Sequence, residues 1–186
     1  HTRCLSDWSS DVCSSDLQYR NSLRGFREKL ARDPALYDRT IVTAVRAPER
    51  RDLAPRGSLD LVLTFRNVHN WAVDFGIDQA MFNAFFDALK SGGVLGVVEH
   101  RAKAGTAYED MKRSGYMTEA YVIDLAEKAG FRLAARSEVN ANPRDTKDYA
   151  VGVWALPPTF RNGDVDHQKY ADIGESDRMT LKFVKP

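Results

Sequence analysis

The sequence predicts an α/β fold built on a largely parallel β-sheet. Segments with apolar residues at helical spacing alternate with short apolar runs, and strands that alternate with helices form parallel βαβ units. The composition, 43% hydrophobic and 28% charged, is that of an ordinary globular chain, and its length fits one domain with a sizeable core. The predicted strands are 41–45, 59–65, 93–100, 131–139 and 179–184.

The first part of the chain predicts a helix, a strand and a loop. Apolar residues at helical spacing indicate a helix over 22–32, which ends before Pro34. The β-branched run IVTAV, 41–45, indicates a strand, and the polar stretch after it, with two Pro and a Gly, indicates a loop. Because a chain that begins on a helix is unusual for this fold class, we expect at least one further strand upstream.

The middle of the chain predicts two buried strands around a helix. LDLVLTF, 59–65, is almost continuously apolar, which is typical of a parallel strand covered on both faces. An apolar stripe over 77–89 predicts a helix, and Ser91-Gly92-Gly93 is expected to end it, because glycine readily adopts the left-handed conformation. GVLGVVEH, 93–100, predicts the second strand.

The last part predicts a capped helix and two strands that no helix separates. Thr118 is expected to cap a helix that Gly130 ends. The strands 131–139 and 179–184 can pair antiparallel at the sheet edge. The connection between them, 140–178, is too long for a plain turn. Its aromatic residues favour packing over disorder, and they are Tyr149, Trp154, Phe160 and Tyr170.

Composition excludes several classes of function. The formal net charge is +1, and Lys and Arg form no long run, so no nucleic-acid partner is expected. Both cysteines, Cys4 and Cys13, lie in the first 17 residues, so 18–186 contains no disulfide, thiolate nucleophile or cysteine metal site. No apolar run reaches the roughly 18 residues of a membrane span.

Residues 1–17 have an unusual pattern. DWSSDVCSSDL contains three Asp, four Ser and one Cys, with neither helical nor strand periodicity. Back-translated in frame, it resembles a widely used short-read sequencing adapter. We therefore expect 1–17 to be a non-native, adapter-derived segment that is excluded from fold reasoning, with native sequence from Gln18. The alternative is a genuine Ser/Asp-rich disordered leader.

Several motifs together resemble one family. These are LDLVLTFRNVHNW, MFNAFFDALKSGGVLGVVEHRAKAG and the tail NPRDTKDY…GVWALPP…YADIGESDRMTLKF. They are similar to the second half of a class I S-adenosylmethionine-dependent methyltransferase, and closest to a bacterial group of predicted methyltransferases. The matching features are a strand entered by Asp60, a polar turn with His69, a turn at 90–93 and a strand that ends in Glu99. Ser91 departs from the pattern, because Pro is usual at that position.

The resemblance implies an incomplete Rossmann-like methyltransferase sheet. The family's strand order is 3-2-1-4-5-7-6, with strand 7 antiparallel, and the five predicted strands would be 3 to 7. Strands 1 and 2 would be missing, together with the Gly-rich turn and the acidic residue of the cofactor site. Residues 18–186 would then be the C-terminal part of a single, N-terminally truncated methyltransferase domain, with 140–178 as a lid-like connection. The missing strands would leave an exposed sheet edge beside strand 4, and such an edge would be prone to aggregation.

The family's activity would be methyl transfer from S-adenosylmethionine to a small molecule, with this fragment itself inactive. In open α/β sheets, ligands bind beyond the carboxyl ends of the strands, which directs attention to 65–71 and 99–101. The expected catalytic residues are His69, Glu99 and His100. The expected cofactor contacts are Phe65, Arg66, Asn67 and Asn70. The expected substrate contacts are Trp71, Arg101, Arg144 and Trp154. No metal is expected, because the spacing of the His and Glu residues is not diagnostic.

Each of these roles has a structural alternative. His69 is a candidate base, or it holds the turn by a hydrogen bond. Arg66 can bind an acceptor carboxylate or pair with a neighbouring acid. Glu99 to Arg101 can belong to the acceptor pocket or to a surface ion pair. Trp71 can form a wall of the pocket or pack in the core.

Two other functions stay open at this stage. One is a non-catalytic small-ligand-binding protein on the same fold. The other is a fragment of a nicotinamide-dependent oxidoreductase, which would need a G-x-G-x-x-G turn upstream. The expected partner is a small-molecule methyl acceptor, with no nucleic acid and no membrane span, and the oligomeric state is left open. Cofactor supply favours a cytoplasmic location, with export by a segment upstream of Gln18 as the alternative.

Overall fold

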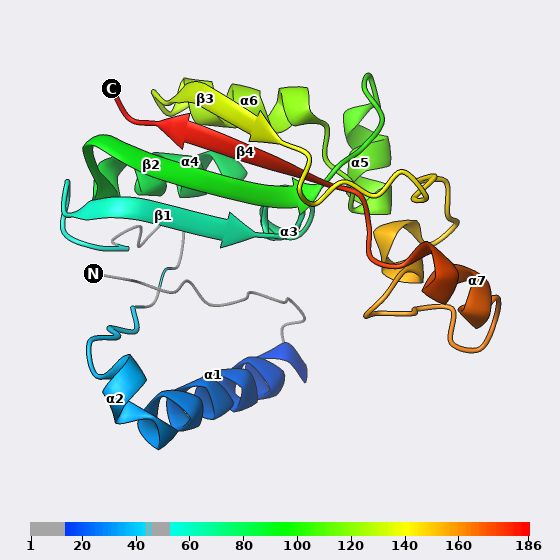
Figure 1. Ribbon diagram of the computed structural model, residues 1–186, viewed down its shortest axis with the longest axis horizontal. Helices are drawn as coiled ribbons and strands as arrows, with labels where there is room; N and C mark the ends of the chain where they lie inside the picture. The colour runs from blue at the N-terminus through cyan, green and yellow to red at the C-terminus, as the bar shows by residue number, and fades with distance from the viewer. Residues whose placement is uncertain (1–13, 44, 46–52) are drawn as a thin grey trace.

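The computed structural model describes residues 14–43, 45 and 53–186 (Figure 1). Two helices come first, α1 (Ser14–Arg32) and α2 (Pro34–Tyr37). The predicted helix 22–32 is confirmed as the larger part of α1. Asp33 caps α2, because its side chain accepts a hydrogen bond from the Leu36 amide.

Four strands form one mixed sheet in the order β1-β2-β4-β3. Their bounds are β1 Leu59–Phe65, β2 Leu89–His100, β3 Arg132–Ser137 and β4 Arg178–Val184. β1 and β2 are parallel, whereas β4 runs antiparallel to both β2 and β3. The predicted antiparallel pairing of the last two strands is confirmed, and the order agrees with the expected 4-5-7-6.

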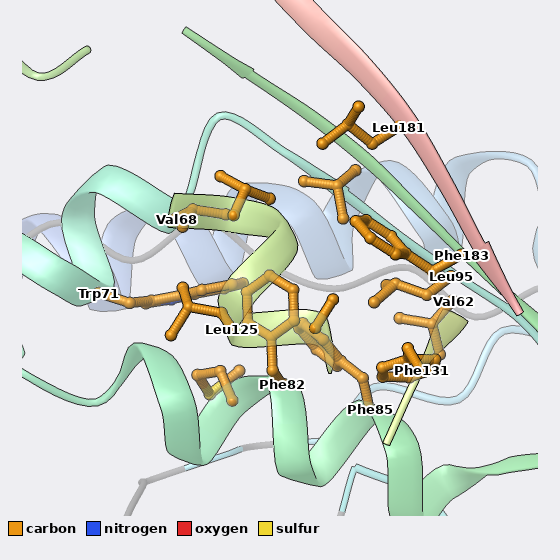
Figure 2. Packing of buried hydrophobic residues seen from close by; sticks show 14 of the residues in the cluster. Val62, Val68, Trp71, Phe82, Phe85, Leu95, Leu125, Phe131, Leu181 and Phe183 are labelled. Atoms are coloured by element: carbon orange, nitrogen blue, oxygen red, sulfur yellow. The ribbon is translucent and has the colours of Figure 1, made fainter. Parts of the chain in front are cut away.

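Two helices cover one face of this sheet, α4 (Asp78–Ala88) and α6 (Glu119–Lys128). Thr118 caps α6 as predicted, since its hydroxyl accepts a hydrogen bond from the Tyr121 amide. The core lies between the helices and the strands (Figure 2), and it includes Phe82, Phe85, Leu95, Leu125 and Phe183. None of the helices in the described ranges has both the length and the apolar character needed to cross a membrane.

The remaining elements lie at the carboxyl end of β1 and β2 or in the connections. Near this end are α3 (Val68–Asn70) and a π-helix (Trp71–Phe75). α5 (Tyr108–Ser114) follows β2. The long connection 140–178 contains a 3-10 helix, η2 (Gly152–Ala155), and α7 (His167–Ile173). The prediction that its aromatic residues pack is confirmed, because Tyr149, Phe160 and Tyr170 join a small apolar cluster around Leu156.

The expectation that 59–65 is covered on both faces is wrong. Leu61, Leu63 and Phe65 are 50%, 43% and 54% exposed, while Val62 and Thr64 are buried. Alternate residues of a strand point to opposite faces, and the described helices cover the face of Val62. The apolar run therefore leaves one row of large side chains in contact with solvent.

The expected helix stop at Ser91-Gly92-Gly93 is also wrong. α4 ends at Ala88, and β2 begins at the next residue, Leu89. Gly92, with φ +78°, donates its N–H to the carbonyl of Lys185, and the N–H of Lys185 donates to the carbonyl of Gly93. The glycines thus serve the end of the β2–β4 pair rather than the end of the helix.

The predicted strand 41–45 is not formed at Ile41 to Thr43 or at Val45, and Ala44 lies outside the described residues. A strand is stable only beside a paired neighbour. Among the described strands, β1 pairs with β2 alone, so the segment from Ile41 to Thr43 has no paired neighbour. The Thr43 hydroxyl instead donates to the carbonyl of Leu53.

A network of charges anchors the connection 140–178 to the sheet. Arg101, which follows β2, donates to both oxygens of Asp177 and to Glu138. Asp145 accepts hydrogen bonds from the Tyr116 hydroxyl and from the Asp177 amide. We call these five residues the Arg101 network. Its members come from four parts of the chain, so it fixes where the connection begins and ends.

Gly152 is expected to be essential for packing η2 on α5. It has φ +63°, and an added Cβ would lie 2.2 Å from the carbonyl oxygen of Ser114. Gly152→Ala should lower the free energy of unfolding by about 3 kcal/mol, from left-handed strain plus overpacking. Gly163, with φ +59° and open space around it, is the matched control, and Gly163→Ala should cost about 1 kcal/mol. Urea denaturation measures both, and equal losses would contradict the packing argument.

Candidate functional site

The candidate site begins at the turn that follows β1. Arg66 has φ +56°, an uncommon conformation for a residue with a side chain, and its N–H donates to the Val98 carbonyl over 2.7 Å. Because β1 and β2 are parallel, this bond brings the end of β1 beside Glu99 and His100. The π-helix that starts at Trp71 directly follows α3, and π-helical turns are frequent at functional sites.

A buried carboxylate orients His69. Its Nδ1 lies 2.8 Å from Glu99 Oε1, and its backbone N–H donates to Glu99 Oε2 over 3.2 Å. The His100 backbone N–H donates to Glu99 Oε1 over 2.8 Å. With the Nδ1 proton directed at the carboxylate, the atom of a neutral His69 that can accept a proton is Nε2. The arrangement therefore fixes both the position and the tautomer of this ring.

The Glu99 carboxyl stays ionised although it is fully buried. Burial raises its pKa, but the charge and the hydrogen bond of His69 lower it more, and the charge and N–H of His100 add to the lowering. The net shift of the Glu99 pKa is downward. A buried negative charge next to an imidazole favours the protonated form of that imidazole, which is what a general base needs when it takes up a proton.

His100 lies beside this pair in a different electrostatic state. Its Nδ1 is 2.5 Å from the Ser176 hydroxyl, and its ring centroid is 5.1 Å from that of His69. Burial lowers the pKa of His100 to about 4, and the positive charges of His69 and Arg66 contribute to this, against the opposing effect of Glu99. His100 is therefore neutral at physiological pH.

A cavity of about 190 Å³ adjoins both imidazoles. Its floor comes from the ends of β1 and β2 and from α3, namely Phe65, Arg66, His69, Asn70 and His100. Its wall comes from the connection 140–178, namely Val153, Trp154, Pro157, Pro158 and Thr159. The Trp154 ring stands edge-on to the His69 ring, with 6.3 Å between their centroids. The Arg161 guanidinium lies over the Trp154 ring, 4.4 Å from its centroid.

The structure brings together six of the predicted site residues around this cavity, with Glu99 directly behind His69. They are Phe65, Arg66, His69, Asn70, His100 and Trp154. The other four do not line it. Trp71 packs in the core against Phe85, and Asn67 is buried. Arg101 belongs to the Arg101 network. Arg144 is exposed, and its backbone N–H donates to Asn142 Oδ1. All these roles remain predictions, but the geometry favours the first group.

Several residues that complete the cavity are distant in the sequence from its floor and were not predicted. Ser176 meets His100 across 76 positions of the chain. Val153, Pro157, Pro158 and Thr159 form the wall beside Trp154. The GVWALPP motif was a signal for this stretch, yet no local pattern says which side of it faces the sheet.

His69, Glu99 and His100 are also the group in the described part of the chain whose ligand atoms, all within 4.8 Å of one another, could hold a metal ion. The Glu99 carboxylate already accepts hydrogen bonds from two backbone amides and one imidazole. These bonds account for its buried charge without a cation. The expectation that no metal is bound stays a prediction.

The depressed pKa of His100 predicts a loss of stability in weak acid. The unfolded chain takes up a proton near pH 6.5, whereas folded His100 does so only near pH 4. Stability from this group is therefore full above about pH 6.5 and falls as the pH drops towards about 4. Between pH 7 and 5, the wild type should lose about 2 kcal/mol more than His100→Gln in urea denaturation. The lowered pKa values of Glu99 and Asp177 change the stability only below about pH 5, outside this window. Parallel curves of stability against pH for the wild type and His100→Gln would contradict the assignment.

Comparison with known proteins places the fold. No protein-family model and no curated protein sequence matches the chain. The [4+2]-cyclase SpnF matches at 18% identity with a TM-score of 0.57, over 86% of this chain and 60% of its own. A predicted sarcosine dimethylglycine methyltransferase from Galdieria sulphuraria matches at 14% identity with a TM-score of 0.57, over 85% of this chain and 64% of its own. The mitomycin 7-O-methyltransferase MmcR matches at 16% identity with a TM-score of 0.53, over 89% of this chain and 40% of its own. This chain thus spans less than two thirds of each relative's length, and it has the α/β fold with a mixed sheet that methyltransferase structures share.

Proposed function

We propose that this chain is the C-terminal part of an S-adenosylmethionine-dependent methyltransferase that acts on a small molecule. The observation that carries the proposal is the histidine oriented by a buried carboxylate, His69 with Glu99, at the carboxyl end of a methyltransferase-like sheet and beside a cavity. Ligands of open α/β sheets bind at this end.

The residues of the site suit a reaction in which an acceptor loses a proton as it gains a methyl group. His69 takes up that proton on Nε2, while Glu99 holds the ring and stabilises the imidazolium. S-adenosylmethionine supplies the methyl group as part of a sulfonium cation. His100 stays neutral, so it adds no charge that would repel this cation. Trp154 and Pro157 line the cavity beside the acceptor, and positioning of the two partners supplies much of the acceleration.

The exposed side of β1 supports the further proposal that part of the cofactor site is encoded upstream of Gln18. Among the described strands, β1 pairs with β2 alone, so its other edge is open, and Leu61, Leu63 and Phe65 are exposed. Two additional strands with their helices would cover this surface. Phe65 and Asn70 would then contact the cofactor from the β1 side.

The chain alone is expected to bind the cofactor poorly. Calorimetric titration with S-adenosylhomocysteine should give no micromolar binding to residues 18–186. A chain extended by the upstream segment of the gene should bind in the micromolar range, because the Gly-rich turn and the ribose-binding acid would be restored. Micromolar affinity of the unextended chain would contradict this proposal.

The roles of His69 and Glu99 are tested in the extended, active protein. His69→Gln should lower kcat about 10² to 10⁴ fold, which is the usual contribution of a general base. Glu99→Gln should lower it as well, because an amide no longer favours the imidazolium. His167→Gln is the control, since His167 is exposed and stacks on Phe160 away from the cavity. Methyl transfer from radiolabelled cofactor measures all three, and unchanged turnover in both site variants would remove the pair from the mechanism.

A second candidate function is ligand chemistry on the same fold without methyl transfer. One of the three structural relatives is named as a [4+2]-cyclase, so the fold alone does not require methyl transfer. This candidate predicts ligand binding in the cavity, with no label transferred to any acceptor by the extended protein.

A further inference from the structure

We propose that Arg66 binds a carboxylate, or a similar compact oxyanion, of the small molecule that occupies the cavity. The identity of that molecule as methyl acceptor rests on the proposed function, but the anion site itself does not. The inference is carried by the backbone of Arg66, by its lack of an acidic partner and by the charges around the cavity.

The backbone of Arg66 is held in a conformation that glycine adopts more easily. Its φ is +56°, and the N–H is fixed by the bond to the Val98 carbonyl. Phe65 before it is paired with Val98, and Asn67 after it is buried. Strained residues of this kind cluster at ligand-binding sites, because surrounding structure must maintain them. The fold therefore holds an arginine at the cavity, whose lining includes Arg66.

Among the described residues Arg66 has no acidic partner, unlike Arg101 and Arg178 at the same end of the sheet. Arg101 is bonded to Asp177 and Glu138, and Arg178 pairs with Glu175 over 2.5 Å. No carboxylate of the described residues lies within 4.0 Å of the Arg66 guanidinium. Its five N–H donors form a planar fork that matches a carboxylate.

The charge on the lining of the cavity is positive. Arg66 carries it, since His100 is neutral, and the lining includes no acidic residue. The nearest carboxylate, Glu99, is fully buried and is bonded to His69 and to backbone amides. Under the proposed function, the site must also accept a sulfonium cation. An anionic group on the occupant would balance Arg66 and remove a repulsion that a neutral occupant leaves in place.

The remaining lining indicates the body of the occupant. Beside its polar groups, the lining includes the flat or apolar residues Phe65, Trp154, Pro157 and Pro158. A small planar acid, such as an aromatic carboxylic acid with an ionisable hydroxyl group, fits this combination. Its carboxylate would meet Arg66, and its hydroxyl would face His69. The amino-acid end of the cofactor carries a carboxylate too, so the experiment must separate the two sources.

The test uses the chain as it exists, titrated by nuclear magnetic resonance with 4-hydroxybenzoate and with the uncharged 4-hydroxybenzamide. The acid should bind more tightly than the amide. Arg66→Gln should weaken binding of the acid at least tenfold and leave the amide unchanged, and Arg66→Lys should restore part of the loss. Gln and Arg bear the same backbone strain, so the thermal midpoint should not move. Arg132→Gln is the control, because Arg132 lies at the opposite end of the sheet, paired with Val184.

A titration of the extended protein with S-adenosylhomocysteine and with 5′-methylthioadenosine, which lacks the carboxylate, identifies the source. If Arg66→Gln weakens only the benzoate, the acceptor carries the anion. If it weakens only S-adenosylhomocysteine, the anion site stands and the cofactor carries the anion. Equal affinities of wild type and Arg66→Gln for both acids, or no binding of either acid up to its solubility limit, overturn the inference. Acid binding through Arg66 in an extended protein that transfers no methyl group would retain the inference and reject the proposed function.

Discussion

The site depends on one buried carboxylate. Glu99 is fully enclosed, and a charge in that position is tolerated only because three donors reach it. Two of the donors belong to His69 and one to His100, so a single side chain ties the end of β2 to the turn that follows β1. The direction of the His69 ring and the position of both imidazoles at the cavity follow from this connection.

A second buried carboxylate has the corresponding effect on the wall. Asp177 accepts bonds from Arg101 and Lys147, and these contacts lower its pKa to about 2 although burial opposes them. Asp145 joins Asp177 to Tyr116, whose pKa is raised by burial and by that carboxylate. These contacts hold the connection 140–178 near both of its ends, and Trp154, which lines the cavity, lies between them.

Local patterns in the sequence were sufficient for the elements that form their own contacts. The apolar stripes of α4 and α6 and the cap of α6 at Thr118 depend on residues that lie close together in the sequence. The antiparallel pairing of β3 and β4 followed from the absence of a predicted helix between them. The exposed row of β1 was not predictable, because it depends on which helices cover the sheet. The floor of the site followed from the rule that ligands bind at the carboxyl ends of strands. Ser176 and the wall could not be predicted, because contacts across more than 75 positions leave no pattern in the local sequence. That Trp71 and Arg101 do not line the cavity could not be predicted either, because the partners that hold them, the core and Asp177, are also distant in the sequence.

The two parts of the cavity depend on different carboxylates, and this division bears on how such a site can evolve. The floor is maintained by bonds to Glu99, and the wall by bonds to Asp177. No bond of either carboxylate involves Val153, Trp154, Pro157 or Thr159. Substitutions at Val153, Pro157 or Thr159 can change the shape of the cavity while the bonds between Glu99 and His69 stay in place. A lineage built on this architecture is free to exchange one ligand for another while the His69–Glu99 pair stays intact.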